Sequence, residues 1–360
     1  MSASAIVLAA GEGSRMRSER PKPLHLICGR SMVMHVIHSL AEIDLAATVV
    51  VVGHGADRVT RKVRDDAPAW AHVRFTTQHE QRGTGDATMV GLSGLAGDDL
   101  DDTSTVLLLP GDTPLLHGET VAALVTEHEK AGNAATVLTS VLDDATGYGR
   151  IVRDKYKRVQ RIIEHRDARA DELGIREVNT GIYAFRRDLL APALRQIGTN
   201  NSQGEYYLTD VVAVLASTGH HVGALVASAT ETAGVNDRLQ LAAAERELRA
   251  RINRRWLLDG VTMLDPSQAF IDATVTIGRD VTLFPGVILQ GDTVIGDRCE
   301  IGPDTRLVDT TVGSGSTVSV TTATGASVGS DATVGPYAHL AAGTRVADGR
   351  TTGPFYTGTP

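Results

Sequence analysis

A glycine-rich turn followed by basic residues is the first part of the sequence that could carry chemistry. Residues 5–10 are apolar and lead into Gly11-Glu12-Gly13-Ser14-Arg15-Met16, and Lys22 follows. Backbone N–H groups on such a turn can bind phosphate oxygens, while Arg15 and Lys22 can hold a polyphosphate that leaves during a reaction. Met16 replaces the third glycine of a G-x-G-x-x-G motif, and the Gly-Lys-Ser/Thr ending of a P-loop is absent. An ordinary tight turn with solvated charges is the alternative.

Asp112 is a second candidate, because it follows the apolar run 106–109 almost directly. A carboxylate at the end of a strand can face a bound ligand, although an aspartate in a Gly-Asp pair is about as often a turn or helix N-cap residue. The sequence has no His/Cys cluster with the spacing of a zinc site, and no nucleophile–base pair stands out. These residues favour phosphate binding and leave the role of Asp112 open.

The elements that must position these residues are short β-branched runs that alternate with helical segments over residues 1–230. We expect strands at 5–10, 48–52, 106–109, 136–140 and 181–185, and helices at 32–43 and 119–131. This alternation predicts an α/β fold with a mostly parallel sheet that helices cover on both faces. Ligands bind beyond the carboxyl ends of the strands in such sheets, which is where residues 11–16 and Asp112 would lie.

The sequence changes character after Gly260. Aliphatic residues recur at every sixth position, at Ile277, Leu283, Leu289, Ile295, Ile301 and Leu307, and again at Val328, Val334, Leu340 and Val346. Six-residue repeats of this kind predict a parallel β-helix whose aliphatic side chains point inward. Residues 310–330 span a slip in phase, and we expect an irregular loop or a less regular coil there. Residues 351–360 are expected to have left the repeat.

Composition and charge narrow the class of protein. The chain has 360 residues, enough for about two domains, and its formal charge of −8 disfavours a nucleic-acid partner. Residues 236–258 predict one long helix with five arginines, and the interleaved acidic residues indicate a solvated connecting helix. Two cysteines, no apolar run of bilayer length and no basic leader predict a cytoplasmic protein without a membrane partner.

Further motifs occur in an order that resembles one family. Residues 8–16 followed by Pro21-Lys22-Pro23-Leu24 resemble the signature of sugar-1-phosphate nucleotidyltransferases. After them come, in family order, Gln78, Gly83-Thr84-Gly85, residues 110–115, Gly147-Tyr148-Gly149-Arg150, Glu164-His165, residues 177–181, residues 203–210 and Gly234-Val235-Asn236. With the six-residue repeats, the whole chain resembles the bifunctional N-acetylglucosamine-1-phosphate uridylyltransferase/glucosamine-1-phosphate acetyltransferase family.

This resemblance implies a fold, a domain organisation and an activity. Residues 1–235 would form a Rossmann-like nucleotidyltransferase domain with a mixed, mostly parallel sheet, residues 236–259 a connecting helix, and residues 260–360 a short left-handed parallel β-helix of hexapeptide repeats. The implied reaction joins UTP and N-acetylglucosamine 1-phosphate to give pyrophosphate and UDP-N-acetylglucosamine, a peptidoglycan and cell-wall precursor. The phosphate nucleophile is already anionic, so catalysis reduces to alignment and charge neutralisation. The implied assembly is a homotrimer.

The resemblance also assigns site residues. Catalysis would depend on Arg15 and Lys22, and an Mg²⁺ cofactor would be held by Asp112 and Asn236. The nucleotide-binding set would be Leu8, Ala9, Ala10, Gly11, Gly13, Gln78, Gly83 and Thr84. The sugar-binding set would be Gly149, Glu164 and Asn179. Asp86 stands where the family commonly has a histidine, and we assign it no direct role.

The family's second activity, acetyl transfer from acetyl-CoA, is not expected, because that half looks truncated or lost. No lysine follows Lys157, and His339 stands where the family usually has an arginine. Two alternatives remain open. The chain could be a nucleotidyltransferase for another hexose 1-phosphate, or a non-catalytic trimeric scaffold that only binds nucleotide.

Overall fold

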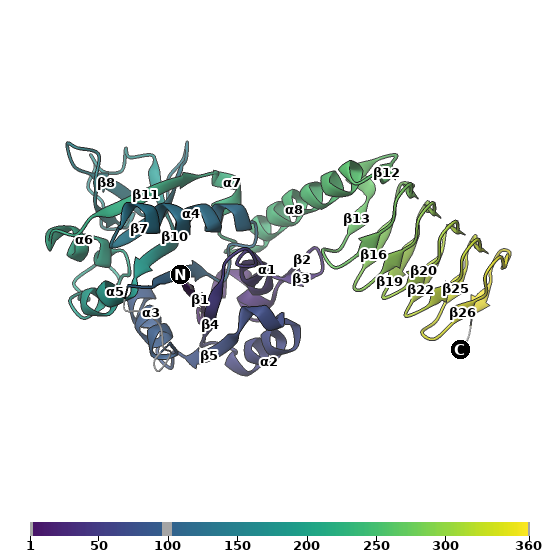
Figure 1. Ribbon diagram of the computed structural model, residues 1–360, viewed down its shortest axis with the longest axis horizontal. Coiled ribbons are helices and arrows are strands. Elements are labelled where there is room, and N and C mark those ends of the chain that lie inside the picture. The colour runs from purple at the N-terminus through teal and green to yellow at the C-terminus, as the bar shows by residue number, and fades with distance from the viewer. Residues whose placement is uncertain (1–2, 96–102, 359–360) are drawn as a thin grey trace. The chain divides into compact units, whose positions relative to one another are not determined.

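The chain folds into two compact units, which we describe one at a time. The computed structural model describes residues 3–95 and 103–358 (Figure 1). Unit 1 comprises Met1–His25 and Ser31–Leu241, and unit 2 comprises Leu26–Arg30 and Ala242–Pro360. The short segment Leu26–Arg30 therefore groups with residues far later in the chain, which no sequence pattern indicated.

Unit 1 is built on a nine-stranded sheet. Its main path runs, in spatial order, through β11 (Val222–Ala227), β7 (Ala135–Val141), β10 (Glu177–Arg186), β6 (Thr105–Pro110), β1 (Ala3–Ala9), β4 (Leu45–Val52) and β5 (Val73–Thr77). Off this path, β8 (Arg150–Arg153) pairs with β10 and with β9 (Val159–Ile163). β10 is antiparallel to β6 and β7, whereas β6, β1, β4 and β5 run parallel. The expected mixed, mostly parallel sheet is confirmed.

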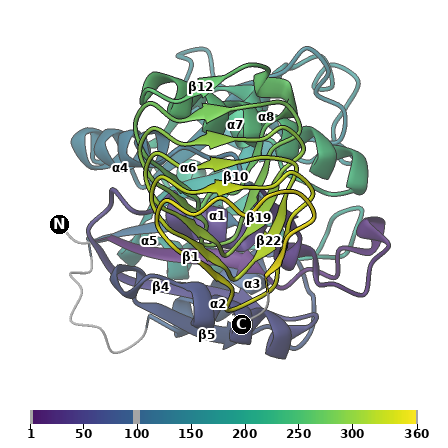
Figure 2. The same cartoon turned by 90° about the vertical axis from the view of Figure 1, so that its right-hand side faces the viewer.

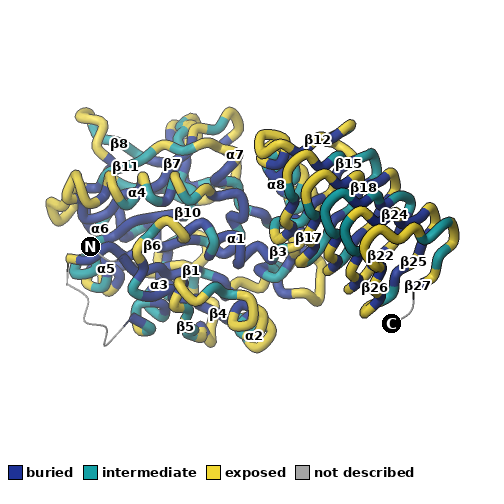
Figure 3. Tube along the Cα trace, turned by 45° about the vertical axis from the view of Figure 1, so that its right-hand side comes forward, coloured by how far each residue is buried: buried dark blue, intermediate teal, exposed yellow. Residues whose placement is uncertain are grey.

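Helices cover both faces of this sheet. One face carries α1 (Met32–His38), α2 (Ala56–Asp66) and α4 (Gly118–Ala131), and the other carries α3 (Thr84–Ser93), α5 (Arg187–Leu194) and α6 (Asp210–Ser217). Smaller elements are α7 (Ala229–Thr232) and the 3₁₀ turns η1 (Ser14–Met16), η2 (Lys22–Leu24) and η3 (Ala69–Ala71). The paired strands β2 (Leu26–Ile27) and β3 (Arg30–Ser31) span the segment Leu26–Arg30 that groups with unit 2. Successive residues of a strand face opposite sides, so Ile6 packs in the core with α3 and Val7 in the core with α1. The strands of this sheet are mostly buried between the two layers of helices, as the dark blue segments of Figure 3 show.

The predicted elements of this half are present, some with different ends. The strand expected at 181–185 begins earlier, at Glu177, because its first residues pair with β7 and β8. The helix expected at 32–43 ends at His38. There the Ser39 hydroxyl donates to the Val36 carbonyl at 2.7 Å and competes with the helical hydrogen-bond ladder. The helix expected at 119–131 is α4.

The long helix α8 (Arg238–Leu258) leads along the chain from unit 1 into unit 2. It matches the helix expected at 236–258, and it buries one face, which includes Ala244, Ile252 and Trp256. In the part of the chain that the structure describes, no helix is both long and apolar enough to span a bilayer.

The rest of unit 2 is a stack of coils whose short parallel strands form three sheets (Figure 2). The first sheet contains β12 (Thr262–Met263), β15 (Thr282–Leu283), β18 (Glu300–Ile301), β21 (Thr317–Val318) and β24 (Thr333–Val334). The second contains β13 (Phe270–Ile271), β16 (Ile288–Gln290), β19 (Arg306–Val308), β22 (Thr322–Thr324), β25 (His339–Leu340) and β27 (Thr357–Gly358). The third contains β14 (Thr276–Ile277), β17 (Val294–Ile295), β20 (Thr311–Val312), β23 (Ser327–Val328) and β26 (Arg345–Val346), and the turn η4 (Pro266–Gln268) precedes β13. The predicted parallel β-helix is confirmed, and repeat residues such as Leu283, Leu289 and Ile301 are fully buried.

Residues 310–330 form coils of the β-helix, so the expectation of an irregular loop is wrong, and the alternative of a less regular coil is confirmed by the change in coil length. The slip in phase arises because some steps of the inward series are one position shorter than the others, namely those that end at Val312, Ala323 and Val328. The coil length changes as a result. Leu289 pairs with Leu307, and Leu307 pairs with Ala323, so the second of these coils is shorter than the first. The stack also continues beyond 351, since β27 pairs with β25.

Candidate functional site

The candidate site of unit 1 lies at the carboxyl ends of β1 and β6. The chain runs from β1 outward to β4 and β5, and then crosses back to β6 on the other side of β1. Open α/β sheets bind ligands at such a reversal, because the two loops that follow the adjacent strands diverge there. The loop after β1 holds residues 11–16, and the loop after β6 holds Gly111 and Asp112.

The glycine turn packs closely against its neighbours. Leu8 and Ala9 end β1, with Ala10 directly after them, and Gly111 N–H donates to the Leu8 carbonyl at 2.8 Å. Gly13 has φ 66°, and a Cβ at that position would lie 2.5 Å from the Lys22 Cβ, so glycine is required there. A Cβ on Gly11, in contrast, would meet no atom within 4 Å, which leaves space above the turn for a ligand.

Four of the predicted residues meet in what we call the Lys22 cluster, which consists of Arg15, Lys22, Asp112 and Asn236. The Lys22 ammonium contacts the Asp112 carboxylate and donates to Asn236 Oδ1 at 2.8 Å. Arg15 Nη2 donates to the same Asn236 oxygen at 3.1 Å. A backbone bond from Val235 N–H to the Asp112 carbonyl, at 2.9 Å, ties the two loops together. The cluster stays accessible, because the Lys22 and Asp112 side chains are 13% and 26% exposed.

The donor set of this cluster suits a hard cation. The Asp112 carboxylate and the Asn236 amide oxygen already converge on one positive group, the Lys22 ammonium. Among residues 3–95 and 103–358, no three His, Cys, Asp or Glu side chains gather as a metal site. Two oxygen ligands from the protein would leave the other positions of a divalent ion to water and phosphate, which is the usual pattern for Mg²⁺.

The predicted base-reading residues lie in one loop between β5 and α3. Gln78 directly follows β5, and the residue is 4% exposed. Its Nε2 donates to Asp86 Oδ2 at 2.8 Å and to the Gly83 carbonyl at 3.3 Å. Gly83 has φ 106°, and a Cβ there would lie 2.6 Å from the Tyr206 carbonyl, so no larger residue fits. Thr84 begins α3 and is exposed.

The three predicted sugar-reading residues also come together. Asn179 N–H donates to the Gly149 carbonyl at 2.9 Å, and a Cβ on Gly149 would lie 3.5 Å from both Glu164 Oε1 and the Asn179 Cβ. Burial raises the pKa of Glu164, although the Thr209 hydroxyl donates to its Oε1 at 3.2 Å and acts in the opposite direction. The result is a carboxylate and an amide beside a position that has no side chain.

The role of residues 203–210 was not apparent from the sequence, although their motif was. Tyr206 closes the base-reading loop, because its carbonyl accepts from Gly85 N–H at 2.8 Å. Leu208 N–H donates to Thr84 Oγ1 at 3.1 Å. The motif therefore links the base-reading loop to Thr209, which contacts the predicted sugar site. Backbone contacts of this kind leave no residue-type signal that sequence reasoning could have found.

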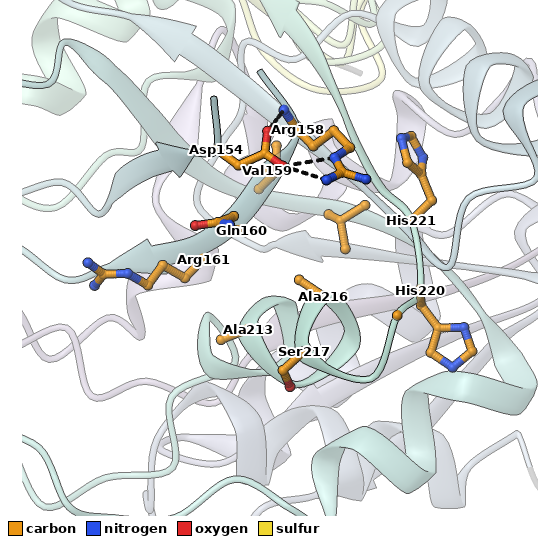
Figure 4. A pocket seen from close by; sticks show the side chains of 12 residues that line it. Asp154, Arg158, Val159, Gln160, Arg161, Ala213, Ala216, Ser217, His220 and His221 are labelled. Carbon is orange, nitrogen blue, oxygen red and sulfur yellow. Dashed lines mark hydrogen bonds and ion pairs between the residues drawn. The ribbon is translucent and has the colours of Figure 1, made fainter. Parts of the chain in front are cut away.

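A separate groove of about 410 Å³ lies beside β9 and α6 (Figure 4). Arg158, Arg161, His220 and His221 line it, and Arg158 is paired with Asp154. None of the site residues expected from the sequence lines this groove. It is therefore distinct from the Lys22 cluster, from the base-reading loop and from the sugar-reading residues Gly149, Glu164 and Asn179.

Comparison with known proteins gives two family matches and many relatives. The MobA-like NTP transferase domain matches residues 5–201, and the bacterial transferase hexapeptide (six repeats) matches residues 274–308. The chain is 50% identical to the bifunctional protein GlmU of Streptomyces avermitilis and 49% identical to that of Streptomyces coelicolor. Each match covers 96% of this chain and 70% of the relative. The GlmU of Caldanaerobacter subterraneus is 43% identical over 93% of this chain and 71% of that protein.

The match to the transferase domain covers the glycine turn and three residues of the Lys22 cluster, namely Arg15, Lys22 and Asp112. It also covers the base-reading loop and the sugar-reading residues. The transferase domain accounts for over half of the chain, and the relatives are matched over more than two thirds of their own length. Enzymes of this family use a divalent metal ion, which agrees with the donor set of the cluster. The chain therefore belongs to the family of bifunctional GlmU proteins and is a nucleotidyltransferase that forms UDP-N-acetylglucosamine.

Proposed function

We propose that the Lys22 cluster, the base-reading loop and the sugar-reading residues together carry out the uridylyl transfer from UTP to N-acetylglucosamine 1-phosphate. A phosphate oxygen of the sugar phosphate forms a bond to the α-phosphorus of UTP, and the bond from that phosphorus to the oxygen bridging the β-phosphate breaks. Pyrophosphate leaves. The nucleophile is already an anion, so no side chain has to remove a proton. The observation that carries the proposal is the Lys22 cluster, where two cationic side chains meet a carboxylate–amide pair.

The phosphate groups belong, in this proposal, to the glycine turn and the Lys22 cluster. Backbone N–H groups of Gly11 and Gly13 bind phosphate oxygens. Arg15 and Lys22 stabilise the negative charge that grows on pyrophosphate as the bond breaks. Asp112 and Asn236 would hold Mg²⁺, which supplies charge neutralisation at the phosphates. Both oxygens of this pair already face a cationic group, which supports the assignment.

The uracil base and the sugar are bound by the base-reading loop and by the sugar-reading residues, respectively. Uracil contacts Gln78, Gly83 and Thr84, and the nucleotide lies along the backbone of residues 8–10. The sugar lies against Gly149, where a Cβ would come within 3.0 Å of a neighbouring side chain and would narrow the space. The Glu164 carboxylate accepts hydrogen bonds from sugar hydroxyl groups. The Asn179 amide can both donate to and accept from the N-acetyl group.

Pyrophosphate release from UTP tests this function. We expect turnover with N-acetylglucosamine 1-phosphate and Mg²⁺, loss of turnover in EDTA, and recovery when excess Mg²⁺ is added. Faster turnover with glucose 1-phosphate would favour a different sugar substrate. Nucleotide binding without pyrophosphate release from either sugar phosphate would contradict the proposal and favour a non-catalytic scaffold.

We also propose that residues 1–235 act as the transferase domain, residues 236–259 as a connecting helix and residues 260–360 as a β-helix that forms a homotrimer. The matched hexapeptide repeats support this assembly. So do outward apolar side chains on the coils, since Phe270 and Val294 are 42% and 41% exposed. Light scattering should give three times the 38.1 kDa chain mass at micromolar concentration. A value of one chain mass would contradict the trimer.

A further inference from the structure

We propose that Asp86 is a positioning residue that sets the base specificity of the site, because it fixes the orientation of the Gln78 carboxamide. The inference rests on the proposed function, in which Gln78 contacts the base of the nucleotide. Asp86 lies in the first turn of α3 and is partly buried. An acidic residue there also stabilises the helix through the helix dipole, and what distinguishes Asp86 is the contact that its carboxylate makes.

Gln78 is held in place at both its backbone and its side chain. Its backbone N–H donates to the Val52 carbonyl at 2.8 Å, which fixes the residue beside the end of β4. Its side-chain Nε2 donates to Asp86 Oδ2 at 2.8 Å and to the Gly83 carbonyl at 3.3 Å. The bond to the carboxylate is shorter and charge-assisted, and such bonds are about twice as strong as neutral ones. Asp86 therefore contributes most to the orientation of the amide.

The two partners leave the amide only one orientation. A carboxylate and a backbone carbonyl accept hydrogen bonds and cannot donate them, so Gln78 must turn Nε2 toward them and Oε1 away. Within the described part of the chain, Oε1 has no hydrogen-bond partner, and it is not among the buried polar atoms that are sealed from solvent. Gln78 thus presents a fixed hydrogen-bond acceptor that cannot become a donor while Asp86 is a carboxylate.

A fixed acceptor distinguishes the two pyrimidine bases. Uracil carries a hydrogen on N3 and can donate to Oε1, whereas N3 of cytosine has a lone pair and would face the oxygen without a hydrogen between them. Sites that leave a buried polar group unpaired reject the wrong substrate strongly. We therefore expect a preference for UTP over CTP of roughly 100-fold or more in kcat/KM. Thymine has the same imide edge as uracil and is not rejected by this mechanism.

Two substitutions of Asp86 test the inference. Asp86→Asn keeps the shape of the side chain, but its amide can donate as well as accept, so Gln78 can turn and offer Nε2 to cytosine. Asp86→Ala removes the partner altogether. We expect the UTP/CTP ratio of kcat/KM to fall by about tenfold or more in both variants, with a rise in CTP use by Asp86→Asn. The UTP/dTTP ratio should not change, because both bases donate from N3.

Two controls separate orientation from a general structural role. Asp57→Asn removes a first-turn carboxylate from α2 that faces solvent, and it should leave both ratios unchanged. Gln78→Ala should lower the UTP/CTP ratio by itself. If Asp86 acts through Gln78, the double variant Gln78→Ala/Asp86→Ala should show no further loss of that ratio. Circular dichroism confirms that each variant is folded.

An unchanged UTP/CTP ratio in both Asp86 variants would overturn the inference, and so would a further loss in the double variant. A parallel fall of the UTP/dTTP ratio would also overturn it, since that result indicates a loosened loop. Calorimetric binding of UTP, CTP and dTTP gives the same ratios without turnover. If the unaltered enzyme binds UTP but releases no pyrophosphate with N-acetylglucosamine 1-phosphate, the proposed function fails while the binding ratios still decide the role of Asp86.

Discussion

His128 should make the stability of unit 1 depend on pH. The residue lies on α4 and is 2% exposed, and its Nδ1 is 3.0 Å from Thr136 Oγ1. Its Nε2 is buried and has no hydrogen-bond partner. A second ring proton would therefore be buried as a charge without a counter-ion. Burial, and then the nearby positive charge of Arg186, lower the pKa of His128 to about 4.

The size of the effect follows from the difference between the folded and unfolded states. An unfolded histidine has a pKa of about 6.5, so the unfolded chain takes up the proton first as the pH falls. The stabilisation from a neutral His128 is complete above pH 6.5 and is lost between pH 6.5 and pH 4, with a total of about 3 kcal/mol. By pH 5, about 2 kcal/mol of it should be gone.

Urea unfolding measures this loss when only unit 1 is observed. The chain has two tryptophans, Trp70 in unit 1 and Trp256 in unit 2, so a Trp256→Phe background leaves Trp70 as the probe. In that background, we compare the free energy of unfolding with and without His128→Gln. The difference between the two proteins should change by about 2 kcal/mol between pH 7.5 and pH 5, in the direction that weakens the histidine form. A difference that is the same at both values would refute the argument.

Three further predictions concern catalysis. Asp112→Ala should lower turnover on the order of 10³-fold while leaving the unfolding curve nearly unchanged, and normal Mg²⁺-dependent turnover would remove Asp112 from the site. Arg15→Ala and Lys22→Ala should each lower kcat much more than they raise the KM for the sugar phosphate, because the positive charges of the two side chains are needed most as pyrophosphate leaves. An unchanged kcat in both variants would show that Arg15 and Lys22 are only surface charges. A protein made of residues 1–360 should release no thiol above background from acetyl-CoA and glucosamine 1-phosphate, because residues 158–360 contain no lysine and His339 is exposed on β25. Sugar-dependent thiol release above background would contradict this prediction.

Most elements of the fold could be predicted because periodicity is local. The apolar run before Gly11 and the six-residue series up to Leu307 each follow from the burial of one face of a short segment. The series fails at Val312 because a turn that loses one residue changes the spacing without changing the strand. The grouping of Leu26–Arg30 with unit 2 could not be predicted either, since it depends on contacts between segments far apart in the chain.

The candidate site, like the fold, could be predicted only in part from the sequence. The residues of the Lys22 cluster were expected from motif order, and they meet in the structure. Asp86 was not, because a carboxylate in the first turn of a helix is ordinary in sequence. The role proposed for Asp86 follows from its hydrogen bond with the Gln78 amide, which only the three-dimensional structure reveals.

Because some steps between inward residues are one position shorter, the coils in the middle of the β-helix contain fewer residues than the coils on either side. The coil from Leu307 to its partner Ala323 is shorter than the coil from Val328 to its partner Val346, so the coils widen again toward the end of the stack. Ala323 is fully buried at the narrow point, so Leu in its place would be overpacked, at a cost of about 1–3 kcal/mol. Because each strand pairs only with the strands above and below it, a residue lost at a corner shrinks one coil without shifting the ladder. Deletions at the corners can therefore accumulate over evolution and change the cross-section of the β-helix, while the strands of its three sheets stay in register.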